Sequence, residues 1–195
     1  DVSENLDPRD WFLARRAAAY KAWYEHMPAR RSMVPFGPHA TIYTRAAFGS
    51  LAQFHVLDNR QHRAPEACPR AGRGGSNVVD VAQCRELADP SRTMLGATQE
   101  AWLDAGLAAS RTKWNLVVQQ TMVAQFDQQP GAGRRAWTDS WDGYPAARRK
   151  LLEAVRDRKV ANPVFLGGDV HMFYVTDLKV DFDDAASPVV ASEFV

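Results

Sequence analysis

The stretch "PVFLGGDVH", residues 163–171, joins an apolar run to two glycines and then to an aspartate and a histidine. Residues 163–166 show no alternation of polar and apolar side chains, which predicts a strand that is buried on both faces. Asp169 and His171 are two positions apart, so in an extended segment their side chains point the same way. The glycines would let the backbone come close to a bound ion or substrate. The stretch therefore predicts a buried strand that ends in a candidate site.

The segments around this strand predict an α/β domain. The run "NLVV" at 115–118 also lacks alternation, so a second strand is expected to be buried on both faces. Pro145 is expected to open a helix, because proline is favoured at the first helical position. Phe12, Tyr20 and Trp23 recur at helical spacing and are predicted to face the core. Helices are expected over 6–27, 98–113 and 145–159, and strands over 50–61, 115–123, 163–168, 173–180 and 187–195.

The length, composition and net charge of the sequence allow one domain, and they argue against a nucleic-acid-binding protein and against a transmembrane protein. With 195 residues, 46% of them apolar, the chain can bury a core of its own. The net charge of +1, with acids and bases interspersed, argues against nucleic-acid binding. No apolar run is long enough for a transmembrane segment. The sequence starts at Asp1 in polar sequence and stops within a predicted strand, so we expect it to be truncated at both ends from a larger protein.

Cys68 and Cys84 flank a loop that is rich in glycine and arginine and cannot build much core by itself. A disulfide between them would close this loop and restrict the unfolded chain. The pair allows one pairing only, and the alternative is two unrelated buried thiols. We predict the disulfide, and with it an oxidising compartment.

Polar side chains follow three of the predicted strands. They are Asp58 and Arg60, Gln119 and Gln120, and Asp169 and His171. Because binding sites of α/β sheets gather beyond the carboxyl ends of the strands, these side chains are candidates for one site, although the sequence does not require the strands to be neighbours. Asp169 and His171 offer ordinary metal ligands. The alternative is an aspartate that accepts backbone hydrogen bonds in a turn and a histidine satisfied in the core.

Two further acidic segments give weaker signals. Asp139, Asp142 and Tyr144 precede the helix at Pro145, and turn chemistry alone accounts for an Asp-Gly pair followed by a proline. The acidic segment 181–184 has the composition of a calcium loop but lacks the EF-hand spacing and its closing glutamate. A solvated hairpin is therefore the simpler interpretation of that segment.

Taken together, these segments resemble the PhoD-type alkaline phosphatases, a family in which some relatives act as phospholipase D-like phosphodiesterases. The resemblance follows the order of the chain and covers nearly all of it. The segments are "RRAAAYKAWYEHMP" at 15–28, "FHVLDNRQHR" at 54–63, residues 92–125 with "KWNLVVQQT", "DSWDGYPAARRKLL" at 139–152, and 162–182 with 187–195. The resemblance implies a calcineurin-like metallophosphoesterase fold, with two β-sheets between layers of helices.

The resemblance also implies a metal centre. The wider superfamily has a late Gly-His-x-His motif, and the matching residues here are Gly168, Asp169, Val170 and His171, so the first histidine is replaced by an aspartate. An earlier superfamily histidine corresponds to Gln120. Oxygen donors suit calcium better than zinc, and PhoD-type enzymes are known for iron (Fe³⁺) and calcium (Ca²⁺). His171 would bind the iron and Asp169 the calcium side, while Gln120 would bind metal directly or through a water.

The family's first metal motifs lie N-terminal to the matched region, so residues 1–195 would be the C-terminal part of one catalytic domain. The expected function is metal-dependent hydrolysis of phosphate esters by an exported enzyme, periplasmic or extracellular. Arg60 would contact phosphate or form a structural ion pair, and Asp142 and Tyr144 would line the pocket. One alternative is a non-catalytic fragment or subunit that completes a metal site with another chain, which would supply the missing N-terminal half. The other is a calcium-stabilised binding module.

Overall fold

A six-stranded sheet organises residues 3–195, the part of the chain that the computed structural model describes. Its strand order is β1-β2-β4-β6-β8-β7, and β3 and β5 form a separate two-stranded sheet. The helices are α1 (Arg9–His26), α2 (Gly96–Ala109) and α3 (Pro145–Asp157), with short 3-10 turns η1 (Arg31–Met33), η2 (Arg85–Ala88) and η3 (Trp141–Gly143). The strands are β1 (Thr44–Phe48), β2 (Ala52–Val56), β3 (Val78–Asp80), β4 (Trp114–Val118), β5 (Arg135–Trp137), β6 (Pro163–Leu166), β7 (Val175–Lys179) and β8 (Val189–Phe194).

The centre of the large sheet is parallel. Strand β4 pairs with β2 on one side and with β6 on the other, both parallel, and β6 pairs with β8 in the same direction. The register places Phe54 beside Leu116, and Leu116 beside Val164. The strands β1 and β7 close the two edges as antiparallel partners. The carboxyl ends of β2, β4 and β6 therefore meet at one edge of the sheet, which is where ligand sites of such sheets form.

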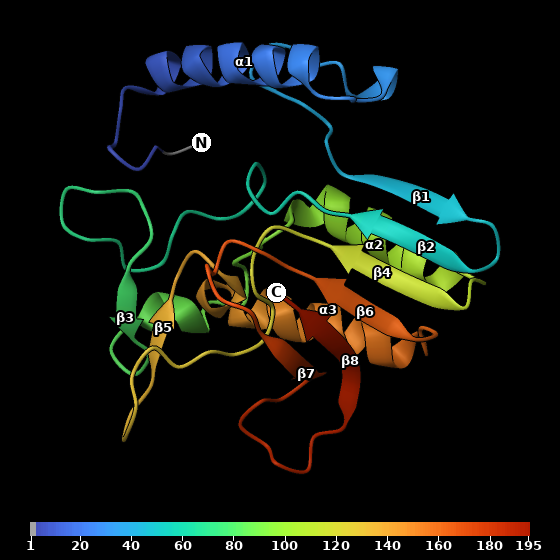
Figure 1. Ribbon diagram of the computed structural model, residues 1–195. Coiled ribbons are helices and arrows are strands. Elements are labelled where there is room, and N and C mark those ends of the chain that lie inside the picture. The colour runs from blue at the N-terminus through green and yellow to red at the C-terminus, as the bar shows by residue number, and fades with distance from the viewer. Residues whose placement is uncertain (1–2) are drawn as a thin grey trace.

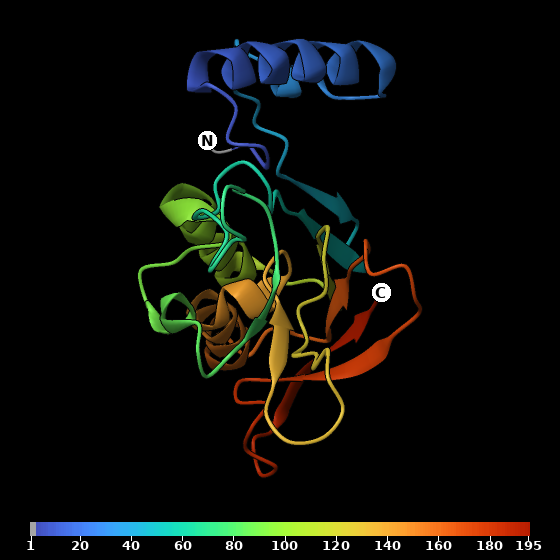
Figure 2. The ribbon, with the colours of Figure 1, turned by 90° about the vertical axis from the view of Figure 1, so that its left-hand side faces the viewer.

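Helices α2 and α3 cover one face of this sheet (Figures 1 and 2). Val117 of β4 and Phe165 of β6 are completely buried there, in one cluster with leucines of both helices. In α3 the buried apolar residues are those that the helical spacing places together: Leu151, Leu152 and Val155. The α/β class expected from the sequence is confirmed by this arrangement.

The opposite face of the sheet has no layer over it among residues 3–195. Alternation along the strands turns Phe54, Leu116 and Val164 to this side, because their sequence neighbours point into the helix-covered core. Phe48 and Trp114 lie on the same face with 69% and 39% of their surface exposed. The second sheet, β3–β5, does not cover this face but lies beyond the carboxyl ends of the parallel strands (Figure 1). The two sheets that were expected are thus very unequal in size, and helices flank only one face of the larger sheet. The prediction that β4 and β6 are buried on both faces is therefore wrong for residues 3–195, in which only the helix-covered face is buried.

Helix α1 does not contribute to the core of the described chain, so the prediction that its aromatic residues face the core was wrong. None of its residues is buried, and Phe12, Tyr20 and Trp23 are only half-buried. In both views the helix lies apart from the sheet and its two covering helices. Helical spacing identifies an apolar face, but burial also needs a surface that packs against that face.

Candidate active site

The polar residues that follow β2 and β4 are joined directly to each other. The backbone N–H of Asn59 donates to Gln120 Oε1 at 2.8 Å, and Gln120 Nε2 donates to the carbonyl oxygen of Leu57 at 2.7 Å. Asn59 Nδ2 also donates to Gln119 Oε1 at 2.7 Å. These bonds fix the loop after β2 against the end of β4. The convergence of strand ends that the sequence suggested is therefore present.

The same bonds engage both polar atoms of the Gln120 amide. Its Oε1 accepts a hydrogen bond from the backbone of Asn59, and its Nε2 donates to the backbone carbonyl oxygen of Leu57. The side chain therefore joins the end of β4 to the segment that follows β2. This geometry favours a structural role, and metal binding by Gln120 stays a prediction.

The two glycines after β6 explain how the chain turns into the site. An added Cβ at Gly167 would lie 2.5 Å from the carbonyl oxygen of Thr121, so a larger residue would force β6 away from the end of β4. Asp169 and His171 then adopt left-handed backbone angles, with φ of 70° and 63°. Such angles are uncommon for residues with a side chain and tend to gather at functional sites. The backbone thus presents both side chains in an exposed loop beyond the strand.

Asp169 and His171 line a large pocket at this edge of the sheet, with a volume of about 990 Å³. Phe126, Trp137 and Tyr174 supply aromatic walls, and Asp139 approaches from the segment after β5. The pocket therefore combines aromatic walls with polar and charged side chains that could bind a ligand.

Arg60 connects the loop after β2 to this pocket. Its Nη1 donates to both carboxylate oxygens of Asp139 at 2.8 and 2.7 Å, and its Nη2 donates to Asp169 Oδ2 at 2.9 Å. Arg63 approaches Asp139 from the other side, with Nη1 at 2.9 Å from Oδ1, and also pairs with Glu66 at 2.7 Å. Of the two roles considered for Arg60, the ion pair is observed. The pairing also holds the guanidinium against Asp169, which lines the pocket.

The charges in this cluster control its pKa values. Burial raises the pKa of the Asp139 carboxyl, but the hydrogen bonds and charges of Arg60 and Arg63 outweigh burial and lower the pKa overall. Burial lowers the pKa of Arg60, and its two carboxylate partners reverse that effect and raise it overall. Burial raises the pKa of Glu66 to about 7, against the attraction of Arg63. Asp139 and Arg60 are therefore an ionised pair over the whole neutral range.

Asp142 and Tyr144 lie behind the pocket and not on its surface. Asp142 is buried, forms an ion pair of 2.5 Å with Arg148, and accepts the backbone N–H of Phe126 at 2.9 Å. Tyr144 is fully buried, and its hydroxyl donates to the carbonyl oxygen of Ala64 at 2.7 Å. Direct contact of either residue with substrate stays a prediction that this geometry does not favour.

The donors for a metal are suitable in kind but too few. A carboxylate and an imidazole suit calcium and iron respectively. Within residues 3–195, however, no group of three or more His, Cys, Asp or Glu side chains lies close enough together to hold a metal ion. Asp169 is instead neutralised by Arg60. The described residues therefore do not form a complete metal site.

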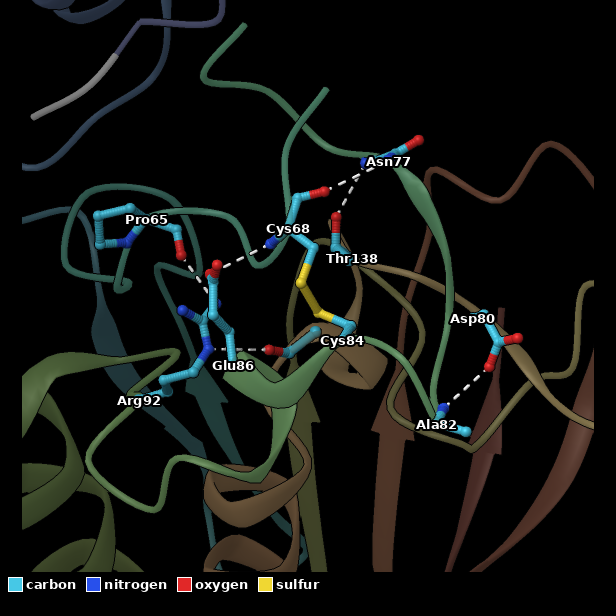
Figure 3. Close-up of a disulfide and its surroundings, with 10 residues drawn as sticks. Pro65, Cys68, Asn77, Asp80, Ala82, Cys84, Glu86, Arg92 and Thr138 are labelled. Carbon is cyan, nitrogen blue, oxygen red and sulfur yellow. Dashed lines mark hydrogen bonds between the residues drawn. A yellow bond between two sulfur atoms is a disulfide. The ribbon is translucent and has the colours of Figure 1, made fainter. Parts of the chain in front are cut away.

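The predicted disulfide is present and fixes one wall of the site (Figure 3). Cys68 and Cys84 enclose the loop that contains β3, and Asn77, which directly precedes β3, is bonded to Thr138. The backbone N–H of Asn77 donates to Thr138 Oγ1 at 2.9 Å, and the backbone N–H of Thr138 donates to the Asn77 carbonyl at 3.0 Å. Thr138 immediately precedes Asp139, so the stapled loop is connected to the Arg60 cluster by one residue.

Residues 2–195 match the family model that is described as PhoD-like phosphatase. The chain belongs to the PhoD-like phosphatase family. It is similar to alkaline phosphatase D of Bacillus subtilis (strain 168), with 40% identity over 184 residues, which is 94% of this chain and 30% of that protein. A solved structure described as "Structure of PhoD" matches with a TM-score of 0.87 and 37% identity over 100% of this chain and 36% of that one.

This PhoD-like chain thus spans about a third of the relatives that it matches. The lack of a complete metal site among residues 3–195 is consistent with a chain that spans only part of these relatives. Across residues 3–195, no helix has both the length and the apolar character that crossing a bilayer requires.

The sequence offered Asp139 only as a weak candidate and did not identify Arg63 as a site residue of this PhoD-like chain. Asp139 is 79 positions from Arg60, and it belongs to a segment that turn chemistry also explains, so nothing in the sequence linked it to Arg60. Arg63 follows Arg60 by three positions, and this spacing was the only local signal of a shared partner.

Proposed function

We propose that the protein hydrolyses phosphate esters in a metal-dependent reaction, as a phosphomonoesterase or phosphodiesterase of the PhoD type. Family membership over 2–195 supports the reaction class. The observation that carries the proposal is the pocket at the carboxyl ends of the parallel strands, which Asp169 and His171 line and where Arg60 is paired with Asp169. This is the place where α/β sheets bind phosphorylated ligands.

In this proposal Asp169 and His171 are metal ligands, with His171 on iron and Asp169 on the calcium side. The bound metals would supply Lewis-acid stabilisation of the phosphate oxygens and activation of a water or oxide. Arg60 donates to phosphate oxygens through its planar fork, from the position that Asp139 gives it. Asp142 and Tyr144 support the pocket wall from behind.

The remaining ligands come from a part of the catalytic domain outside residues 3–195, which we place on the open face of the large sheet. That face exposes apolar side chains of the three central strands, and parallel sheets are normally covered on both faces. The chain spans 30% of alkaline phosphatase D, which leaves ample sequence for such a layer. The disulfide supports an exported, periplasmic or extracellular protein, because disulfides persist in oxidising compartments.

The test compares His171→Ala with His26→Ala in the full-length protein. His26 is exposed on α1, far along the chain from the pocket, and serves as the matched control. We expect His171→Ala to lose bound iron by elemental analysis and to hydrolyse p-nitrophenyl phosphate or bis-p-nitrophenyl phosphate at least about a hundredfold more slowly. His26→Ala should keep both. Wild-type metal content and rate in His171→Ala would reject the proposed site.

A second candidate is that residues 1–195 are a non-catalytic subunit or fragment that contributes part of the metal site. The absence of a three-ligand group among residues 3–195 favours this description of the isolated chain. Elemental analysis of the isolated chain, alone and mixed with the remainder of its catalytic domain, separates the two. Metal and activity that appear only in the mixture would support the fragment description, and a stoichiometric metal in the isolated chain would contradict it.

A further inference from the structure

Asp139 lies between two arginines at the edge of the pocket. It follows β5 of the small sheet and does not come from the end of a strand in the large sheet. It accepts from Arg60 Nη1 through both oxygens and from Arg63 Nη1 through one. We propose that Asp139 is a positioning residue, which holds the Arg60 guanidinium at the pocket so that Arg60 can recognise the phosphate group. The inference rests on the proposed function, because it concerns how the substrate is bound.

The first argument is the freedom that Arg60 would otherwise have. Its side chain is 39% exposed and belongs to a loop beyond β2. A long side chain in such a place samples many rotamers, and binding a phosphate would then require it to be ordered. Asp139 binds Nη1, so the guanidinium is already oriented, and its Nη2 is bonded to Asp169, which lines the pocket. Orientation before binding improves affinity without any new contact.

The second argument is that Asp139 is itself rigidly held. Its side chain is only 13% exposed, and Arg63 bonds to both its carboxylate and, at 3.3 Å, its backbone carbonyl oxygen. Arg63 is fixed in turn by Glu66. The paired arginines and the buried carboxylate make a compact cluster in which each charge has a partner.

The third argument is the covalent support behind Asp139. Thr138 is bonded to Asn77 in both directions, and Asn77 Nδ2 donates to the carbonyl oxygen of Cys68. The disulfide to Cys84 then closes this loop. A carboxylate that is anchored through a stapled loop can fix the position of an arginine, whereas a carboxylate on a free loop would follow the arginine.

The experiment is a double-mutant cycle with Asp139→Asn and Arg60→Gln in the full-length protein. We expect Asp139→Asn to raise KM for p-nitrophenyl phosphate, and the inhibition constant of inorganic phosphate, by about tenfold each. Its kcat should change by less than about threefold, because uniform binding is lost and not transition-state stabilisation. The double variant should be no worse than Arg60→Gln alone, because without the arginine Asp139 has nothing to position.

Two further variants serve as controls for the charge of Asp139 and for the loss of an unrelated ion pair. Asp139→Glu keeps the charge and should recover most of the phosphate affinity. Asp104→Asn breaks an Arg158 ion pair on the helix layer and should leave KM unchanged. If Asp139→Asn does not fold, as judged by urea denaturation, Asp139→Glu and Arg63→Gln are measured instead, and each should raise KM by a smaller factor than Arg60→Gln.

The possible failures are distinguishable. A wild-type protein without hydrolysis or phosphate binding would reject the proposed function. An active wild type with an unchanged KM in Asp139→Asn, or with additive effects of Asp139→Asn and Arg60→Gln, would overturn the positioning role and leave the function standing.

Discussion

Asp142 forms a buried ion pair with Arg148, which is a different role from the substrate contact expected of it. The family resemblance made Asp142 a candidate for substrate contact, while its place in a polar turn before a helix favoured a structural role. In the fold it neutralises Arg148, which also donates to the carbonyl oxygen of Val123 at 3.3 Å, and both side chains are 6% exposed. The pair therefore fixes the start of α3 against the segment after β4.

Replacing Asp142 should lower stability more than catalysis. We expect Asp142→Asn to reduce the free energy of unfolding by roughly 3 kcal/mol, because a buried guanidinium would lose its counter-charge. Urea denaturation followed by circular dichroism measures this loss. The double variant Asp142→Asn with Arg148→Met should recover part of it, since the unpaired charge is then gone. Unchanged stability together with a raised KM would instead support substrate contact.

His55 makes the stability of the chain depend on pH. It is fully buried on β2, and Arg45 Nε donates to its Nδ1 at 3.3 Å. Burial, together with the charge of Arg45, lowers the pKa of His55 from 6.5 to about 4. The folded state thus prefers the neutral ring, and between these two pKa values the unfolded state binds more protons. The contribution of His55 is complete above pH 6.5 and is lost as the pH falls toward 4.

The expected result is a melting temperature that falls between pH 6.5 and pH 4 in the wild type and falls less steeply in His55→Gln. His26→Gln removes an exposed histidine and should leave the slope unchanged. Differential scanning calorimetry at several pH values compares the slopes. Identical slopes in the wild type and His55→Gln would contradict the assignment.

Among the elements, the stapled loop has the clearest physical role. The loop between Cys68 and Cys84 contains only the three-residue strand β3 and packs a small cluster of its own around Ala67, Val79 and Ala136. So small a cluster gives the loop little stability without the covalent link. Strand β3 of this loop pairs with β5, and Trp137 of β5 lines the pocket, so the disulfide also stabilises the pocket wall.

Removal of the disulfide should therefore loosen this wall. For cysteines 16 positions apart, loop entropy gives a loss of roughly 3 kcal/mol in the double variant Cys68→Ser with Cys84→Ser. Urea denaturation of the oxidised wild type and of the variant measures the difference. Hydrogen exchange should rise first in β3 and β5. Equal stability of the two proteins would show that the loop is held by its packing alone.

At the scale of the whole molecule, the large sheet is complete on one face only. Helices α2 and α3 bury Val117 and Phe165, while Phe48, Phe54 and Trp114 face outward on the other side. An apolar surface of this kind favours association with another apolar layer. The isolated chain should consequently behave differently from the complete catalytic domain.

We expect isolated residues 1–195 to self-associate in size-exclusion chromatography with light scattering, because the open face is apolar. The double variant Phe48→Glu with Trp114→Glu should shift the chain toward monomer. Trp11→Glu alters an exposed aromatic residue on α1 and is the matched control. A wild-type chain that is monomeric at high concentration would contradict this role of the open face.

The sequence by itself determined the class of the fold and placed the candidate pair Asp169 and His171 directly after a strand of the sheet. Apolar runs without alternation identified β4 and β6 as strands of a parallel sheet, although residues 3–195 cover only one face of these strands. Asp169 and His171 are two positions apart, so their proximity is a property of the chain itself. Cys68 and Cys84 offered a single pairing, which the structure contains. Patterns of this kind are local, and local spacing controls secondary structure and burial directly.

The tertiary structure alone decided which side chains meet across the chain. It placed Asp139 against Arg60, 79 positions away, and directed Asp142 into the core toward Arg148. It also left helix α1 without the burial that its spacing predicts. Such contacts depend on strand order and on which layers are present. No short pattern contains that information, because the energy that selects a pairing comes from packing the whole sheet at once.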